Sequence, residues 1–401
     1  MSPVNERRSA SSLTLLEGST ELFPALIAAM EAAQHQIRLE TYIFDFTGSG
    51  EGVALALEKA ANRGVETLVM VDGVGSEALS PQWAQRFEDA GVQWRVFTPL
   101  GRFGILAPSR WRRLHRKLCS IDQRVAFCGG INILDDFYDP NHGKLDAPRF
   151  DFAVRITGRL VDDIHDAMSQ VWLRNEHTGR LRVTVQAVVQ ASRAVFKPNL
   201  KALPSPTDKG IRSSLVLRDN LRYRSGIEQA YRKAISQAKS EVIIANAYFV
   251  PGRKLRQALV LAAKRGVKVQ LLLQGKYEYF MQYYAARPVY GVLLAAGVEI
   301  HEYSASFLHA KVAVVDGQWA TVGSSNLDPL SLLLAREANV SVQHKPFAKA
   351  LRARLLNAIN HEGDRMDPAE YAERPLRQRC FEWAAYGLMR VALKLQGRKY
   401  L

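Results

Sequence analysis

The sequence predicts an α/β fold made of two similar halves, and three observations support this. The chain has 401 residues, which is enough for two ordinary domains. Apolar runs of strand length alternate with helical patterns, as is typical of α/β proteins. A motif of His, Lys, Asp, Gly and Asn occurs twice, 194 positions apart, beginning at His115 and at His309. A duplication therefore accounts for both the length and the order of the elements.

The repeat extends beyond this motif and sets the order of elements in each half. We expect a strand, a helix ending in Arg-Gly-Val, a strand, a helix ending in Ala-Gly-Val, a strand, the motif strand and one further strand. Glycines stand where helix C-caps are expected, at Gly64, Gly91, Gly266 and Gly297. The matching segments are 39–44 with 245–250, 60–73 with 262–275, and 89–97 with 295–303.

The chain is expected to divide into two domains, a linker and a tail. The first domain covers residues 1–190 and the second covers 211–360. Segment 197–210 has three Pro and one Gly, a composition typical of linkers. The linker is therefore placed at 191–210, and residues 361–401 form a C-terminal helical tail.

The two motif copies have identical spacing. The first copy places Lys117 two residues, Asp122 seven residues and Asn132 seventeen residues after its His. The second copy repeats these offsets with Lys311, Asp316 and Asn326 after His309. Side chains at i and i+2 of a strand point to the same face, so each strand should present a His and a Lys together.

These residue types suit an anionic tetrahedral substrate. A Lys ammonium is a compact cation for phosphate oxygens. A neutral His can act as a nucleophile or as a general acid or base near neutral pH. The glycines let the backbone approach a ligand, and the Asn adds an amide donor. Two such sets in one place could carry out both steps of a two-step displacement at phosphorus.

The paired motifs resemble the HKD motifs of the phospholipase D superfamily. Longer stretches are most similar to bacterial cardiolipin synthases of the B type, and the likeness runs from about residue 16 to about residue 354. These stretches are LHRKLCSID, EVIIANAYFVPG, AAKRGVKVQLLLQG, LHAKVAVVDGQWATVGSSNLDPLSL and REANV. The resemblance implies two α/β/α sandwich domains related by a pseudo-twofold axis, with one site in the cleft between them.

The resemblance also implies roles for the motif residues. His115 would be the nucleophile that forms a phosphohistidine, and His309 the general acid and base. Two lysines and two asparagines would hold the phosphate oxygens: Lys117, Lys311, Asn132 and Asn326. Gly130 stands where the second motif has Ser324, so the first motif would lack one hydroxyl contact to the phosphate. No metal and no cofactor is expected.

Acidic residues complete the expected site. By resemblance, an acid downstream of each motif fixes the tautomer of a motif His, and Asp151 and Glu337 stand at these places. Asp122 and Asp316 complete the motif and are counted with the catalytic residues, although their position at a strand end also fits a role in bracing a loop.

The expected activity is that of a phosphatidyltransferase. It would join two phosphatidylglycerol molecules into cardiolipin and release glycerol. The motifs also permit a phospholipase D hydrolase or a metal-independent nucleic-acid phosphodiesterase. Lys and Arg exceed Asp and Glu by 15 (54 against 39), which favours an anionic partner. We expect anionic phospholipid and a membrane surface as partners, and no nucleic acid; the sequence leaves the oligomeric state open.

The ends of the chain bear on location. The N-terminus lacks the apolar core of a signal peptide, and no apolar run is long enough to span a bilayer. The tail over 379–401 has apolar residues at helical spacing with cations beside them. Such a pattern is typical of a helix lying in a membrane interface or of a helix packed on its own domain. We expect a peripheral protein on the cytoplasmic face of the bacterial membrane.

Overall fold

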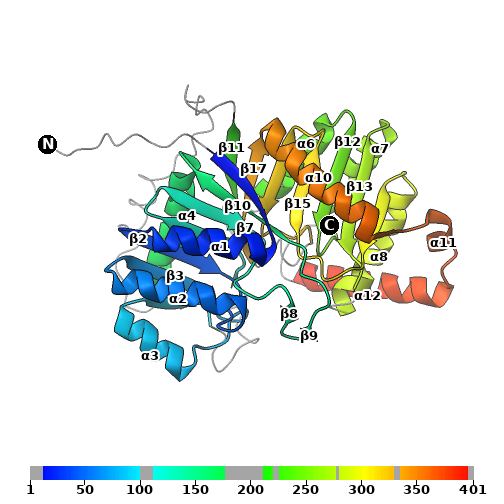
Figure 1. The fold of residues 1–401 in the computed structure, drawn as a ribbon. Coiled ribbons are helices and arrows are strands. Elements are labelled where there is room, and N and C mark those ends of the chain that lie inside the picture. The colour runs from blue at the N-terminus through cyan, green and yellow to red at the C-terminus, as the bar shows by residue number, and fades with distance from the viewer. Residues whose placement is uncertain are drawn as a thin grey trace.

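A computed structural model describes residues 12–99, 112–176, 211–219, 225–276, 280–328 and 335–395. Two large mixed β-sheets lie next to each other, one from each half of the chain (Figure 1). This arrangement confirms the predicted duplicated α/β fold. The expected linker over 191–210 lies outside the described residues, so the domain boundaries stay predictions.

The first sheet has seven strands in the order β1-β10-β7-β6-β2-β3-β4. Strands β2, β3 and β4 are parallel to one another, and the remaining pairs are antiparallel. Parallel neighbours need crossover connections, which the predicted helices supply. The bounds are β1 Ser12–Glu17, β2 Gln36–Thr41, β3 Glu66–Asp72, β4 Gln93–Phe97, β6 Lys117–Ile121, β7 Val125–Gly129 and β10 Phe152–Thr157.

The second sheet repeats this design in the order β11-β17-β16-β15-β12-β13-β14-β18. Here β12, β13 and β14 are the parallel strands. The short strand β5 (Arg113–Leu114) comes from the first half but pairs with β17 of the second. The bounds are β11 Arg212–Arg218, β12 Glu241–Asn246, β13 Lys268–Gln274, β14 Glu299–Tyr303, β15 Lys311–Val315, β16 Trp319–Gly323, β17 Ala335–Gln343 and β18 Gly363–Arg365.

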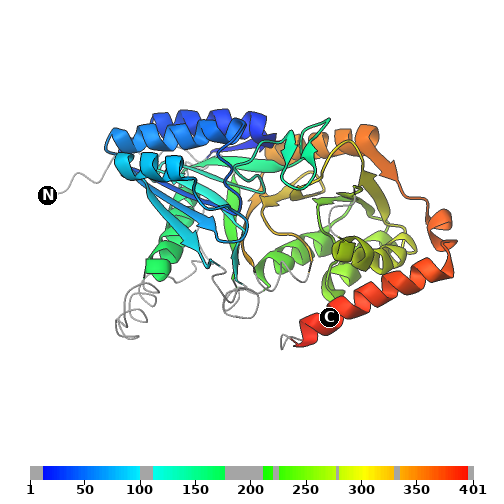
Figure 2. The same ribbon diagram turned by 90° about the horizontal axis from the view of Figure 1, so that it is seen from below.

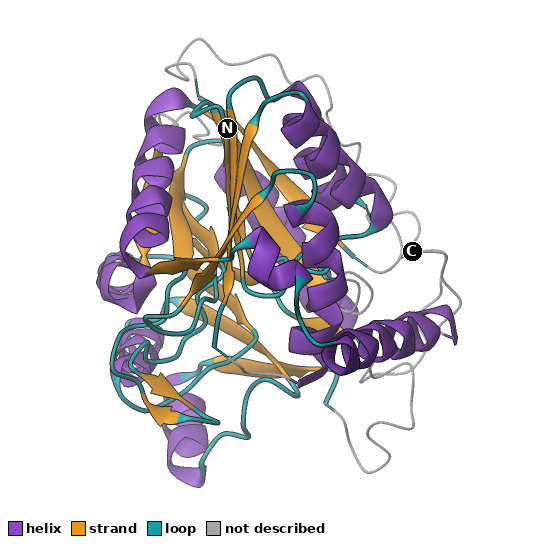
Figure 3. Cartoon of the chain, turned by 90° about the vertical axis from the view of Figure 1, so that its right-hand side faces the viewer, coloured by secondary structure: helices purple, strands orange, loops and turns teal. Residues whose placement is uncertain are grey.

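Helices cover both faces of each sheet, and Figures 2 and 3 show the layers from two further sides. The four glycines predicted at helix ends have φ between 83° and 88°, which confirms them as left-handed caps. The first half has α1 Gly18–Glu31, α2 Ser49–Asn62, α3 Pro81–Ala90 and α4 Leu160–Glu176. The second half has α6 Gly226–Gln237, α7 Arg253–Lys264, α8 Phe280–Leu294 and α10 Lys345–Glu362.

The two halves share one hydrophobic core. Apolar residues of β6, β7 and β10 pack in the same buried cluster as residues of β12, β15, β16 and β17. The last helix of each half also covers the first strand of the other, since α4 packs on β11 and α10 packs on β1. Burial on this scale holds the sheets in a fixed relation, and that relation positions the site described below.

The tail continues as α11 (Pro368–Ala372) and α12 (Leu376–Leu395), and α12 packs along α8 (Figure 1). Among the helices in the described part of the chain, none is both long and apolar enough to cross a bilayer. A small hairpin of β8 (Tyr138–Asp139) and β9 (Gly143–Lys144) projects beneath the sheets (Figure 1).

Candidate active site

Each motif histidine lies where the two halves of the protein meet. The predicted strand over LHRKLCSID is interrupted, because β5 pairs with the second half and β6 with the first. The backbone N–H of His115, between them, donates to the carbonyl of Arg336 at 3.1 Å. The N–H of His309 donates to the carbonyl of Phe150 at 2.9 Å. Each histidine is therefore anchored by the opposite half.

The side chains follow the same crossed pattern. Nδ1 of His115 lies 3.1 Å from the carboxylate of Glu337, which belongs to the second half. Nδ1 of His309 lies 2.7 Å from Oδ2 of Asp151, which belongs to the first half. The acid downstream of a motif thus orients the histidine of the other motif. Sequence alone found both acids but could not say which histidine each would contact.

The ionisable groups of the two halves affect one another, as expected for one shared site. Burial, and the charges of Lys311 and Lys117, hold the pKa of His309 well below 6.5. Burial lowers the pKa of His115 as well, against the opposing effect of Glu337. Both imidazoles are therefore neutral at pH 7 in the free protein.

The two lysines lie at the start of the motif strands. Lys117 Nζ donates to the carbonyl of His115 at 2.8 Å, and Lys311 Nζ makes the matching bond to the carbonyl of His309. Burial lowers the pKa of Lys117 to about 7, and the nearby Lys311 contributes in the same direction. A bound phosphodiester anion would stabilise both ammonium groups and offset this effect.

Asp151 is the most perturbed carboxylate of the site. Burial raises its pKa to about 7, although Lys311 and Lys117 act against this rise. Because its partner His309 is a weak base here, the pair holds one proton that is lost near neutral pH. Such a pair is suited to donate and accept a proton during turnover.

The two asparagines are buried at the ends of the motif loops. Asn132 Oδ1 accepts from the backbone N–H of Ile43 at 3.2 Å. Asn326 Oδ1 is buried without a hydrogen-bond partner among the described residues. An unpartnered buried acceptor is costly unless a donor from a ligand or water satisfies it, so Asn326 Oδ1 suits a hydroxyl group and not a phosphate oxygen, and the predicted phosphate contact would have to come from its amide N–H groups.

Ser324 has a different role from the predicted phosphate contact. Its hydroxyl donates to Glu337 Oε2 at 2.5 Å and so helps to orient the carboxylate beside His115. At the matching position of the first motif, a Cβ on Gly130 would lie 2.6 Å from Asp151 Oδ2. Glycine is thus required there because the carboxylate of Asp151 occupies the space.

The carboxylates of Asp122 and Asp316, which were predicted within the catalytic set, bind backbone N–H groups next to β2 and β12. The carboxylate of Asp122 accepts from three consecutive backbone N–H groups, of residues 34–36, each at 2.8 Å. Asp316 makes the same three bonds to residues 239–241 at 2.8–2.9 Å. Each Asp follows the far end of a five-residue strand, roughly 17 Å along the chain from the motif Lys. They brace the loop before β2 and before β12.

Two residues missed in the sequence fix the backbone before each histidine. Oδ2 of Asp72, at the end of β3, accepts from the N–H of Leu114 at 2.7 Å. Oε1 of Gln274, at the end of β13, accepts from the N–H of Leu308 at 3.0 Å. They occupy matching positions of the repeat, in VMVDG and LLLQG. Aligning the two halves could therefore have identified both residues from the sequence.

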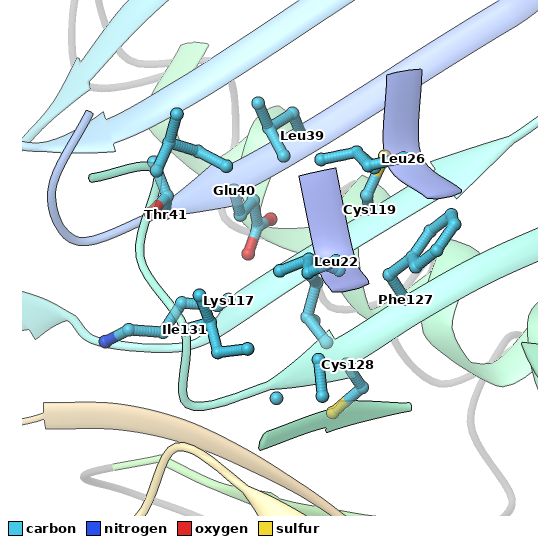
Figure 4. Close-up of a pocket in the computed structure, with 14 residues that line it drawn as sticks. Leu22, Leu26, Leu39, Glu40, Thr41, Lys117, Cys119, Phe127, Cys128 and Ile131 are labelled. Carbon is cyan, nitrogen blue, oxygen red and sulfur yellow. The ribbon is translucent and has the colours of Figure 1, made fainter. Parts of the chain in front are cut away.

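Behind the first motif lies a buried ion pair that the second motif lacks. Arg116, between His115 and Lys117, donates through Nε and Nη2 to Glu40 at 2.5 and 2.8 Å. It also donates to the carbonyl of Ala167 at 2.9 Å. A small pocket beside Glu40 is lined mainly by apolar side chains of α1, β2, β6 and β7 (Figure 4). Lys117 also lines this pocket, but its ammonium group points away from Phe127 and Cys128. This pocket is part of the core rather than of the site.

Comparison with known proteins shows which family this chain belongs to. The family described as "Cardiolipin synthase, PLD-like domain" matches residues 26–143 and 231–358. The chain is 38% identical over 371 residues to cardiolipin synthase B of Salmonella typhi, covering 92% of this chain and 85% of that protein. The chain belongs to the cardiolipin synthase, phospholipase D-like family. Each matched range holds one copy of the motif, so the family accounts for both.

Further comparisons agree with membership in the cardiolipin synthase family. Cardiolipin synthase B of Escherichia coli K12 is 38% identical over 362 residues, covering 90% of this chain and 83% of that protein. Among solved structures, phosphatidylserine synthase of Haemophilus influenzae matches with a TM-score of 0.65 and 14% identity, covering 96% of this chain and 93% of the other. At that identity the structural likeness concerns the fold alone. The predicted superfamily and fold are confirmed.

No group of three or more His, Cys, Asp and Glu side chains with the arrangement of a metal site occurs among the described residues. Cys119 and Cys128 are buried and form no disulfide.

Proposed function

We propose that the protein is a phosphatidyltransferase that joins two phosphatidylglycerol molecules into cardiolipin and releases glycerol. The observation that carries this proposal is the crossed site, in which each half provides an imidazole and a lysine and orients the imidazole of the other half. A single phosphodiester between two such sets would meet a nucleophile and a proton donor together. Family membership supports the choice of lipid substrate.

In the first step, Nε2 of neutral His115 attacks the phosphorus of one phosphatidylglycerol. The N–P bond forms as the bond from phosphorus to the glycerol oxygen breaks, and the leaving alkoxide takes a proton from the His309–Asp151 pair. Lys117 and Lys311 offset the charge that develops on the non-bridging oxygens. The product of this step is a phosphatidyl group on His115 and free glycerol.

In the second step, the hydroxyl of another phosphatidylglycerol attacks the same phosphorus. Its proton returns to the His309–Asp151 pair, the new O–P bond forms, and the N–P bond to His115 breaks. The assignment of roles is supported by the electrostatics. The lowered pKa of His115 keeps a nucleophile unprotonated, while the raised pKa of Asp151 keeps a transferable proton on the opposite pair.

This reaction would take place at a membrane surface, because both the donor and the acceptor are bilayer lipids. We propose that the protein works as a peripheral protein on the cytoplasmic face of the membrane and needs no metal ion. The excess of 15 positive charges supports contact with anionic lipid.

The test is product analysis with phosphatidylglycerol in mixed micelles containing a chelator. We expect cardiolipin and glycerol in equal amounts from the wild-type protein. His115→Ala should form neither product, whereas His361→Ala, which alters an exposed histidine of α10, should retain activity. Absence of cardiolipin from the wild-type reaction would refute the proposal.

The same reaction distinguishes the alternative activities. Phosphatidic acid as the main product would mean that water is the acceptor and that the protein is a hydrolase. Labelled glycerol and labelled phosphatidylethanolamine, supplied as competing acceptors, would identify the preferred alcohol. Cleavage of single-stranded DNA that His115→Ala abolishes would instead assign the site to nucleic acid.

A further inference from the structure

Helix α12 carries apolar side chains on two faces, and only one of these faces is covered. Ala385 and Tyr386 are buried against the body of the protein, and Phe381 meets Tyr284 of α8 with the ring centroids 5.0 Å apart. On the other side are four large exposed apolar residues, which we name the α12 outer face: Leu376, Trp383, Leu388 and Val391. The covered face fits the alternative of a helix packed on its own domain, and the exposed face has the composition that the membrane-interface alternative requires.

This exposure is concentrated rather than scattered. Of the twelve large apolar side chains that are exposed in the described part of the chain, four form the α12 outer face, and Phe381 adds a fifth from the same helix. Single exposed apolar residues are normal, but a contiguous group marks an interaction surface.

The charges on α12 favour an anionic partner. Glu382 is the sole acid in its sequence, and this carboxylate is buried and paired with Arg374 at 2.9 Å. Arg377 and Arg379, by contrast, are exposed beside the outer face. Apolar side chains with cations next to them match the boundary between acyl chains and phosphate headgroups.

The direction of α12 follows from its contacts with α8. The hydroxyl of Tyr371, in α11, donates to the carbonyl of Arg287, and further along the chain Phe381 contacts Tyr284. The chain thus runs antiparallel to α8, toward the beginning of that helix. Helix α8 follows the end of β13, where Gln274 holds the residue before His309. The outer face therefore extends toward the edge of the sheet that carries the site.

A second exposed apolar element flanks the site. The β8–β9 hairpin exposes Phe137 and Tyr138, and its His142 lies against Phe307, two residues before His309, at 4.9 Å between ring centroids. The hairpin and α12 are both labelled in the lower part of Figure 1, below the sheets.

We propose that the α12 outer face docks on an anionic lipid bilayer, with the β8–β9 hairpin as a second contact, and so turns the site toward the membrane. This inference rests on the proposed function for its choice of partner. Docking in this orientation would let two lipids reach the site while their acyl chains stay partly in the bilayer.

The test is co-sedimentation with vesicles of phosphatidylcholine, with and without phosphatidylglycerol. Leu388→Glu is compared with Leu261→Glu on α7, because the two leucines are similarly exposed, at 61% and 57%. The substitution removes a leucine that would be buried in the docked bilayer and adds a carboxylate that anionic lipid repels, so binding to the anionic vesicles should weaken by roughly tenfold or more. The Leu261→Glu protein should bind like the unaltered protein.

All binding is measured in the His115→Ala background, so the result does not depend on turnover. If the wild-type protein made no cardiolipin, the proposed function would be refuted, but the docking result would still stand. Circular dichroism checks that each variant folds, and Val391→Glu, at a residue 53% exposed, serves as a second variant of the same face.

Three results would overturn the inference. Both α12 variants could bind the anionic vesicles as tightly as Leu261→Glu does. Binding could be equal on vesicles without phosphatidylglycerol and insensitive to salt. Finally, Leu388→Glu could dissociate a dimer seen in sedimentation, which would assign the outer face to a second copy of the chain.

Discussion

The buried ion pair behind the first motif permits a quantitative test of how the site is supported. Arg116 and Glu40 are 4% and 3% exposed, and they share two hydrogen bonds. The matching positions of the second half hold Ala310 and Asn246, so the fold tolerates a neutral pair there. We therefore expect Arg116→Ala to harm stability through the carboxylate that it leaves unpaired.

The expected loss is about 3–5 kcal/mol in the free energy of unfolding, the usual cost of removing one partner from a buried ion pair. Adding Glu40→Asn should recover much of this loss, because the double variant reproduces the arrangement of the second half. Urea unfolding at pH 7, followed by circular dichroism, measures both values.

A matched control comes from a more exposed pair of the same type. The side chain of Arg352 is 40% exposed and donates twice to Glu241. Arg352→Ala should cost only about 0.2–1 kcal/mol, since solvent screens such a pair. The reasoning is refuted if Arg116→Ala costs no more than Arg352→Ala, or if the double variant is no more stable than the single one.

Two further predictions concern the site itself. Gly130→Ala should lower kcat by about 100-fold or more, because the added methyl group would displace the carboxylate of Asp151. The control is Gly64→Ala, at a left-handed helix cap where no atom lies near the added methyl group. It should lower the free energy of unfolding by about 1–2 kcal/mol and leave kcat unchanged. Equal kcat values for the two variants would contradict this. The pH profile of kcat/KM should be bell-shaped: activity rises through the pKa of His115, which lies below 6.5, as the nucleophile loses its proton, and falls at higher pH as the Asp151 pair loses its proton. A rate that rises steadily to pH 9 would contradict these roles.

Much of the fold follows from the sequence because the duplication can be read from it. The matched glycines, the alternation of strands and helices, and the two motif copies all agree with the structure. The crossed contacts could not be predicted, because they depend on how two sheets pack through a shared core. Neither the spacing from His115 to Asp151 nor that from His309 to Glu337 carries this information.

Other differences have local causes. The contacts of Asp122 and Asp316 depend on strand length, since the five-residue strand that begins at the motif Lys ends just before each Asp. They also depend on backbone N–H groups that lie far away in the sequence. The role of Ser324 depends on where the longer Glu337 side chain ends. Helix α12 was predicted from its apolar spacing, but which face is covered depends on α8.

The central claim is that each histidine is oriented by the acid of the opposite half. It can be tested most directly by ¹⁵N NMR of labelled histidine, with His115 and His309 assigned through single substitutions. Asp151→Asn should shift the Nδ1 resonance of His309 and leave that of His115 in place, whereas Glu337→Gln should do the reverse. If Asp151→Asn instead moved the Nδ1 resonance of His115, the crossed site would be contradicted.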